Sequence, residues 1–209
     1  MKNVSLFAVG LAVVLCGCAA TSLKQTWKAP DYQGGPVQKI AVLVVEERAL
    51  QRSVLENAFA AELQKQGQAM LTTFKLLTLP EIKADKQAAT RQLQEAGADT
   101  VLIIRLADQV TRDQAIRVSP NRFSPVDTSF GAMDWHGYYF GGDTGMGTVW
   151  GELRQDVYLD SSLHDLKTGK RLWSGITKTV LKEGSDRIEE LRPITSKVVT
   201  AMRKDGLIR

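Results

Sequence analysis

The chain contains little cysteine, little histidine and little net charge. Its only two cysteines are Cys16 and Cys18, and it has two histidines in 209 residues. Beyond Cys18, therefore, no disulfide bond, zinc–thiolate cluster or thiol nucleophile can form. A net charge of +4, from 27 basic and 23 acidic residues, is typical of a solvated surface and does not favour nucleic acid as a partner.

The amino-terminal apolar run is too short for a finished transmembrane helix, which needs about 20 apolar residues. Residues 4–15 form this run, and Lys2 precedes it. A charged start followed by about a dozen apolar residues is typical of an export signal. One interpretation is an ordinary secretory peptide cut after Ala19 or Ala20. A second interpretation, which we favour, depends on the four residues that end the run.

These four residues are Leu15-Cys16-Gly17-Cys18. The pattern Leu-x-Gly-Cys resembles the lipobox of bacterial lipoproteins, which has an apolar residue at −3, a small residue at −1 and cysteine at +1. The resemblance implies that the lipoprotein signal peptidase recognises Leu15 and Gly17. It also implies that Cys18 carries a diacylglycerol and an N-acyl chain. Cys16 fits less well, because Leu15 would then occupy the position that must be small.

The lipobox resemblance also implies a location and a domain plan. Three acyl chains would anchor the protein far more firmly than the marginal binding of a single chain. Ala19 and Ala20 follow Cys18, and the absence of Asp after the lipidated cysteine implies the outer membrane, with the protein on its periplasmic face. We expect a signal peptide over 1–17, a lipidated tether over 18–36, docked by Trp27 and Tyr32, and a periplasmic domain over 37–209.

Alternating strand and helix patterns predict an α/β domain. Residues 39–45 and 99–106 are apolar on both faces, as in covered central strands. A further strand is expected over 68–77, and helices are expected over 49–66 and from Pro80 to Ala96. The apolar stripe predicted for the helix over 49–66 comprises Leu50, Val54, Leu55, Ala58, Phe59, Ala61 and Leu63.

The second half of the chain predicts an antiparallel hairpin and a last helix. Residues 148–166 alternate as a half-exposed strand, with His164 on the polar, solvated face. Residues 167–170 form the turn, and residues 171–182 form the return strand. A helix is expected over 185–204, kinked or restarted at Pro193. The whole is a single mixed sheet with helices packed on it and a carboxyl-terminal helix.

Several motifs carry a wider resemblance. Together with the lipobox, the Trp-Lys-x-Pro motif at 27–30 and the segments 37–43, 97–102 and 166–175 are similar to those of a large group of uncharacterised bacterial lipoproteins. The layout looks more distantly like the periplasmic α/β domain of curli secretion-channel subunits, penicillin-binding-protein activator lipoproteins and the Tol β-propeller protein. These resemblances imply a non-enzymatic interaction or assembly module in the cell envelope. The alternative is a ring subunit of an outer-membrane export assembly.

Residues 119–147 form a long insertion rich in glycine and aromatic residues. Exposed aromatic side chains interleaved with glycine are typical of binding loops. The insertion could equally cover one sheet face, or insert at the lipid interface. It lacks the sustained alternation of an amphipathic membrane hairpin. The candidate partner-binding residues are Phe130, Trp135, Tyr138, Tyr139 and Phe140.

Catalytic patterns are weak in this sequence. Asp134, His136 and Asp143 could form a metal or acid–base site, but two histidines and no further cysteine are a poor ligand supply. Residues 142–147 lack the lysine and the following helix of a phosphate loop. We therefore expect no enzyme, no metal and no cofactor besides the lipid on Cys18. The expected partners are the membrane, an unidentified envelope protein and a second copy of the chain.

Overall fold

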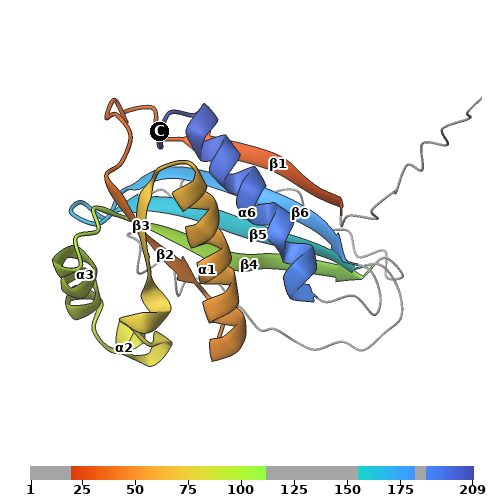
Figure 1. The fold of residues 1–209 in the computed structure, drawn as a ribbon, viewed down its shortest axis with the longest axis horizontal. Helices are drawn as coiled ribbons and strands as arrows, with labels where there is room; N and C mark the ends of the chain where they lie inside the picture. Colours follow the sequence, from red (N-terminus) through yellow and green to blue (C-terminus); the bar gives the residue numbers. More distant parts are fainter. Residues whose placement is uncertain (1–19, 112–154, 182–186) are drawn as a thin grey trace, which may run out of the picture.

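A computed structural model describes residues 20–111, 155–181 and 187–209. These residues form a six-stranded mixed sheet in the order β1-β6-β5-β4-β2-β3 (Figure 1). The predicted α/β class, with a single sheet, packed helices and a carboxyl-terminal helix, is confirmed. The strands are β1 (Ala20–Lys28), β2 (Lys39–Val44), β3 (Ala69–Thr72), β4 (Thr100–Thr111), β5 (Gln155–Asp165) and β6 (Arg171–Leu181). The helices are α1 (Ala49–Lys65), α2 (Leu79–Ala84), α3 (Lys86–Glu95) and α6 (Arg187–Lys204), and Thr73–Lys75 form a 3-10 turn.

Strand β2 is covered on both faces, as its sequence predicts. Ile40 and Val42 belong to one buried core, together with residues of α1 and α6. Ala41 and Leu43 belong to a second core, together with residues of α2 and α3. Because successive strand residues point to opposite faces, each helix pair covers its own side of the sheet. Figure 1 shows α1 and α6 side by side on the near face.

The sheet is parallel at one side and antiparallel at the other. β2 pairs in parallel with β3 and with β4, whereas β4, β5, β6 and β1 pair antiparallel in that order. The predicted turn between β5 and β6 is confirmed, and Gly169 takes the positive φ of 73° that such a turn requires. The Asp165 side chain accepts hydrogen bonds from the backbone and the hydroxyl of Thr168.

The amino-terminal part of the predicted tether is a strand. β1 pairs with β6 from Ala20 opposite Val180 to Lys28 opposite Trp173. The Lys28 amine also donates to the backbone oxygen of Asp205, at 2.7 Å. An edge strand has one unpaired side and exposed polar residues, so β1 lacks the apolar alternation that identifies strands in a sequence.

The predicted apolar stripe of α1 is wrong in part. Leu50 is 70% exposed and Ala61 is also exposed, whereas Arg52 and Glu56 are buried. Two buried opposite charges that bond each other can replace apolar side chains on an inward face.

Two further predictions need smaller corrections. β3 covers only four residues of the segment 68–77, because the chain turns into the 3-10 turn at Thr73. α6 continues through Pro193, so the fresh helix start expected there is wrong, whereas the kink stays a prediction. A proline costs a helix one backbone hydrogen bond, and the packing of Ile194, Val198 and Met202 in the core offsets that cost.

Candidate functional site

The residues predicted to carry function lie outside the described part of the chain. This applies to the lipobox residues Leu15, Gly17 and Cys18, and to the aromatic segment 130–140. Their roles stay predictions. Residues 112–154, which contain the insertion 119–147, lie between Thr111 and Gln155, and these two residues are directly paired in the β4–β5 ladder.

A cavity of about 330 Å³ lies at the carboxyl end of β2. β2 lies between β3 and β4 in the sheet. The connection after β2 runs outward to β3, and the connection after β3 runs back past β2 to β4, so the two connections leave in opposite directions. In open α/β sheets, ligands bind outside the carboxyl ends of the strands at such a switch point. The cavity also has the size of small-molecule sites, which start at about 300 Å³. Its lining includes Glu46, Glu47, Arg52, Phe74, Leu77 and Lys83.

The loop after β2 is held by a charged pair. The Glu46 carboxylate accepts hydrogen bonds from the backbone N–H of Arg48 and from its guanidinium, at 2.9 to 3.0 Å. Burial alone would raise the pKa of Glu46, but these bonds outweigh burial and hold the pKa below its usual value. Glu46 is therefore ionised at neutral pH, and it fixes the loop at the cavity rim.

A buried polar network forms the wall behind the cavity. Glu56 is fully buried, and one carboxylate oxygen accepts from Arg52 Nε at 2.8 Å and from the Thr73 hydroxyl at 3.0 Å. The same oxygen accepts from the Val44 N–H, and the other accepts from the Phe74 N–H. Arg52 Nη2 in turn donates to the Thr73 hydroxyl. The network thus joins α1 to the ends of β2 and β3.

This network was not predicted from the sequence. Its only sequence signal is the spacing of Arg52 and Glu56 by four residues, which places both on one helix face. Such pairs are usually exposed, so the spacing alone does not indicate burial. Thr73, which completes the network, follows Glu56 by 17 residues.

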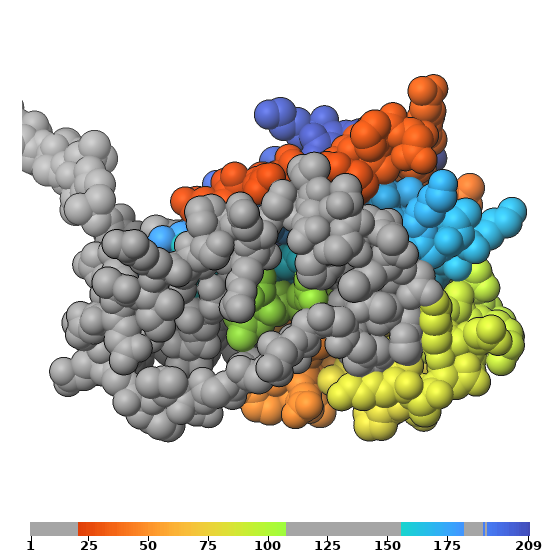
Figure 2. All heavy atoms as spheres, turned by 180° about the vertical axis from the view of Figure 1, so that it is seen from behind, coloured from red at the N-terminus to blue at the C-terminus, as the bar shows by residue number. Residues whose placement is uncertain are grey.

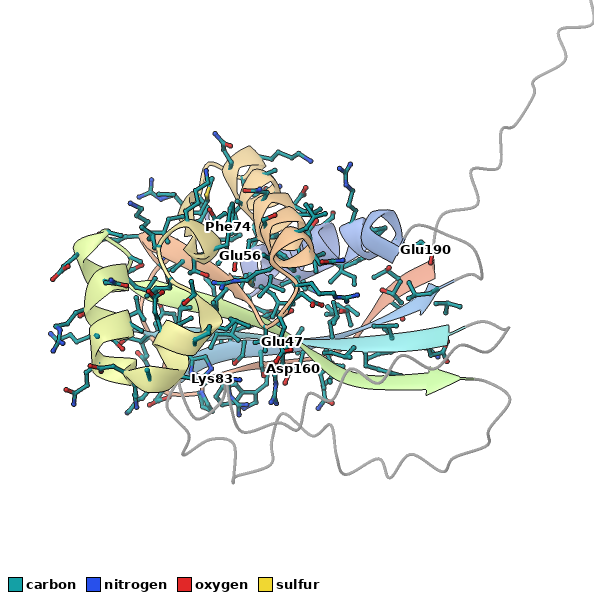
Figure 3. The ribbon with its side chains drawn as sticks, turned by 90° about the horizontal axis from the view of Figure 1, so that it is seen from below. Glu47, Glu56, Phe74, Lys83, Asp160 and Glu190 are labelled. Atoms are coloured by element: carbon teal, nitrogen blue, oxygen red, sulfur yellow. The ribbon has the colours of Figure 1, made fainter. Side chains whose placement is uncertain are left out.

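Helix α2 forms the opposite wall. The Thr78 hydroxyl accepts from the Glu81 N–H, and the Glu81 carboxylate accepts from the Thr78 N–H in return, which is a capping box. The Thr78 hydroxyl also donates to the Glu81 carboxylate, at 2.8 Å. The bonds from the Thr78 N–H and hydroxyl to this carboxylate lower the pKa of Glu81. Figure 3 shows Glu56 and Phe74 close together beside α1, and Lys83 next to α2. The cavity therefore has two structurally fixed walls.

The chemistry of the cavity is mixed. Phe74 and Leu77 supply apolar surface, while the exposed Glu47 and Lys83 place one charge of each sign at the rim. Such a lining suits a small group with an apolar body and a polar end. In the described ranges, no group of three or more His, Cys, Asp or Glu side chains is placed to hold a metal ion.

His164 is buried, not solvated as the strand pattern predicts. Its Nε2 lies 2.9 Å from the Ser162 hydroxyl, and its Nδ1 lies 3.3 Å from the Gly169 carbonyl. Burial, together with the charges of Arg171 and Arg105, lowers the pKa of His164 to about 3, although the Gly169 bond opposes the shift. The ring is therefore neutral at physiological pH, and a neutral, enclosed imidazole of this pKa does not suit acid–base work.

The sheet has two edges within the described residues, β1 and β3. An exposed edge can pair with a strand of another chain. β3 offers four residues, whereas β1 offers nine, interrupted by a register shift between Leu23 and Gln25. Bulges and lysine residues such as Lys24 and Lys28 limit indiscriminate pairing at an edge.

None of the helices in the described ranges is long and apolar enough to cross a membrane.

Comparison with known proteins gives distant structural similarities. No protein-family model and no curated protein matches the chain. The PelC dodecamer from Paraburkholderia phytofirmans is similar with a TM-score of 0.44 and 10% sequence identity, covering 91% of this chain and 99% of that chain. Lipoprotein GNA1162 from Neisseria meningitidis is similar with a TM-score of 0.39 and 17% identity, covering 80% of this chain and 99% of that chain. Neither similarity assigns a role to this chain.

Proposed function

We propose that this protein is a lipid-anchored lipoprotein of the outer membrane that acts as a non-enzymatic interaction module on the periplasmic side. The observation that carries the proposal is the sequence Leu15-Cys16-Gly17-Cys18 at the end of an export signal. The start of β1 at Ala20 supports it. A folded domain that begins two residues after the acylated cysteine is suited to work at the membrane surface.

The anchor is tested by replacing each cysteine in turn. Cys18→Ala should abolish labelling by radioactive palmitate and release the protein from the membrane fraction. Cys16→Ala is the matched control, because Cys16 lies in the removed signal, and it should leave both properties unchanged. Membrane retention of Cys18→Ala, or loss of labelling in Cys16→Ala alone, would contradict the proposed lipobox.

We further propose that the aromatic segment 130–140 contacts the envelope partner. The insertion belongs to residues 112–154, and the residues that border this segment, Thr111 and Gln155, are paired in the sheet, so a rigid scaffold holds the two points between which the segment runs. A photoreactive residue at Trp135 should crosslink to a partner in intact cells, and one at the exposed Leu50 on α1 serves as control. Deletion of 135–140 without loss of folding or of any envelope phenotype would count against this segment.

A second candidate function is self-assembly into an export ring, and the two sheet edges favour it. Pairing of β1 with β3 of a neighbour would be a heterologous contact, which closes into a ring when the rotation permits. Light scattering after size exclusion distinguishes the candidates, using the lipidated protein in detergent and the chain without its anchor. Monomers in both preparations support the tethered module, whereas a closed oligomer in the lipidated form supports the ring.

A further inference from the structure

Four strand ends meet at one end of the sheet. Ala20, the first residue of β1, pairs with Val180, and Leu181, the last residue of β6, pairs with Gln155 at the start of β5. Gln155 also pairs with Thr111, the last residue of β4. We call this the anchor end, defined by Ala20, Thr111, Gln155 and Leu181.

The opposite end of the sheet holds the turn 167–170 and the last residues of the chain. Lys28, at the end of β1, bonds the backbone of Asp205, and Trp173 Nε1 bonds the Asp205 carboxylate. We call this the far end. β6 joins the two ends with eleven residues, which span about 33 Å at the usual rise of a strand. Figure 2 shows the start of β1 and the light-blue turn at opposite ends of the molecule.

The spacing between the predicted anchor and the sheet is very short. Two residues of fully extended chain span about 7 Å, and that is the distance along the sequence from Cys18 to Ala20. β1 cannot lengthen this connection by detaching freely, because it is held along its length by the β6 ladder and at its end by Lys28. Acyl chains in a bilayer would therefore hold the anchor end against the headgroups.

The outer edge of β1 does not favour a domain lying flat on the lipid. The exposed residues in its middle are Leu23, Lys24, Gln25 and Thr26. Only Leu23 among them is apolar, and a surface that lies in the interface needs a continuous apolar face.

We propose that the bilayer faces the anchor end, and that the protein stands upright on the membrane with the turn 167–170 pointing about 33 Å outward. This inference rests on the proposed acylation of Cys18. It commits to a lipid surface as the partner of the anchor end, and it leaves the far end as the part of the domain directed away from the lipid.

Single-cysteine labelling tests the orientation, because Cys18 is acylated and the chain has no later cysteine. The variants Ser22→Cys, Gln25→Cys and Lys167→Cys place a fluorescent probe near the anchor end, in mid-strand and at the far end. The lipidated full-length protein is reconstituted in phosphatidylcholine vesicles that contain a headgroup spin-labelled lipid. Quenching of the probe's fluorescence by the spin label should be strong for the probe at position 22, weaker at position 25 and absent at position 167.

The outcomes separate the anchor from the orientation. Failure of the protein to float with the vesicles would overturn both proposals. Flotation with equal quenching at Ser22 and Lys167 would overturn the upright orientation alone. A control variant carries a 20-residue Gly/Ser linker before Ala20, which has an average reach of about 25 Å. It should still float, but the difference in quenching between the two ends should shrink.

Discussion

Replacement of Glu56 by glutamine is expected to destabilise the fold strongly. Glutamine is similar to glutamate in size and helix propensity, so the change mainly removes a charge and turns one acceptor oxygen into a donor. Arg52, which is 5% exposed, would then be a buried cation without a counter-charge. At least one of the four donors that now face Glu56 would meet an N–H₂ group instead of an oxygen.

The magnitude follows from burial. Removing one partner of a buried ion pair costs about 3–5 kcal/mol, and we take about 3 kcal/mol because glutamine keeps one acceptor oxygen. For a chain of this length, each kcal/mol lowers Tm by about 2–4 °C. The expected loss is thus roughly 6–12 °C.

Glu62 provides a matched control on the same helix. Its carboxylate lies 2.9 Å from Lys65 Nζ, close to the 2.8 Å of the Arg52–Glu56 pair, but Lys65 is 69% exposed. Exposed pairs contribute about 0–1 kcal/mol. Urea unfolding followed by circular dichroism should therefore show a loss for Glu56→Gln several times that for Glu62→Gln. Equal losses would refute the reasoning that burial makes the difference.

Three further predictions concern single side chains. Since the pKa of His164 is about 3 in the folded protein against 6.5 as its ordinary value, only the unfolded chain takes up a proton as the pH falls below 6.5. Stability should drop by about 2 kcal/mol from pH 7.5 to 5, and His164→Gln should remove that drop in urea titrations. Gly175→Ala would place a Cβ 2.5 Å from the Trp173 ring and cost about 1–3 kcal/mol. Gly35→Ala, which meets nothing within 4 Å, should be neutral in the same melts. Asp99→Ala removes the acceptor of two backbone amides at the start of β2, so hydrogen exchange at those amides should accelerate while exchange in α6 does not change.

The central strands and the helix ends could be predicted from the sequence. Residues such as Ile40 to Val44 are apolar on both faces, and only a covered strand accommodates that pattern. Gly67, Gly97 and Gly206 follow helices and have positive φ, which glycine adopts at low cost. These signals are local, and each needs only the neighbouring residues to be interpreted.

The features that could not be predicted from the sequence depend on contacts between segments that are distant along the chain. The exposure of Leu50 and the burial of Glu56 follow from the position of Thr73 and the end of β2, which no helix pattern contains. The burial of His164 follows from the turn that brings the Gly169 carbonyl to its ring. β1 gave no strand signal, because its residues are mostly polar and, among the strands that the structure describes, it pairs with β6 alone.

The pairing of β1 with β6 also constrains the order of folding. The hydroxyls of Thr21 and Thr179, which bond each other across the ladder, are 158 residues apart in the sequence. Closing so long a loop is entropically costly and slow compared with local contacts. β1, the first strand of the described part of the chain, thus finds its place only after almost the whole chain is available. Until then, β6 has an unpaired edge that can recruit strands of other chains, so the interval before β1 docks is the period in which this protein is most exposed to misassembly.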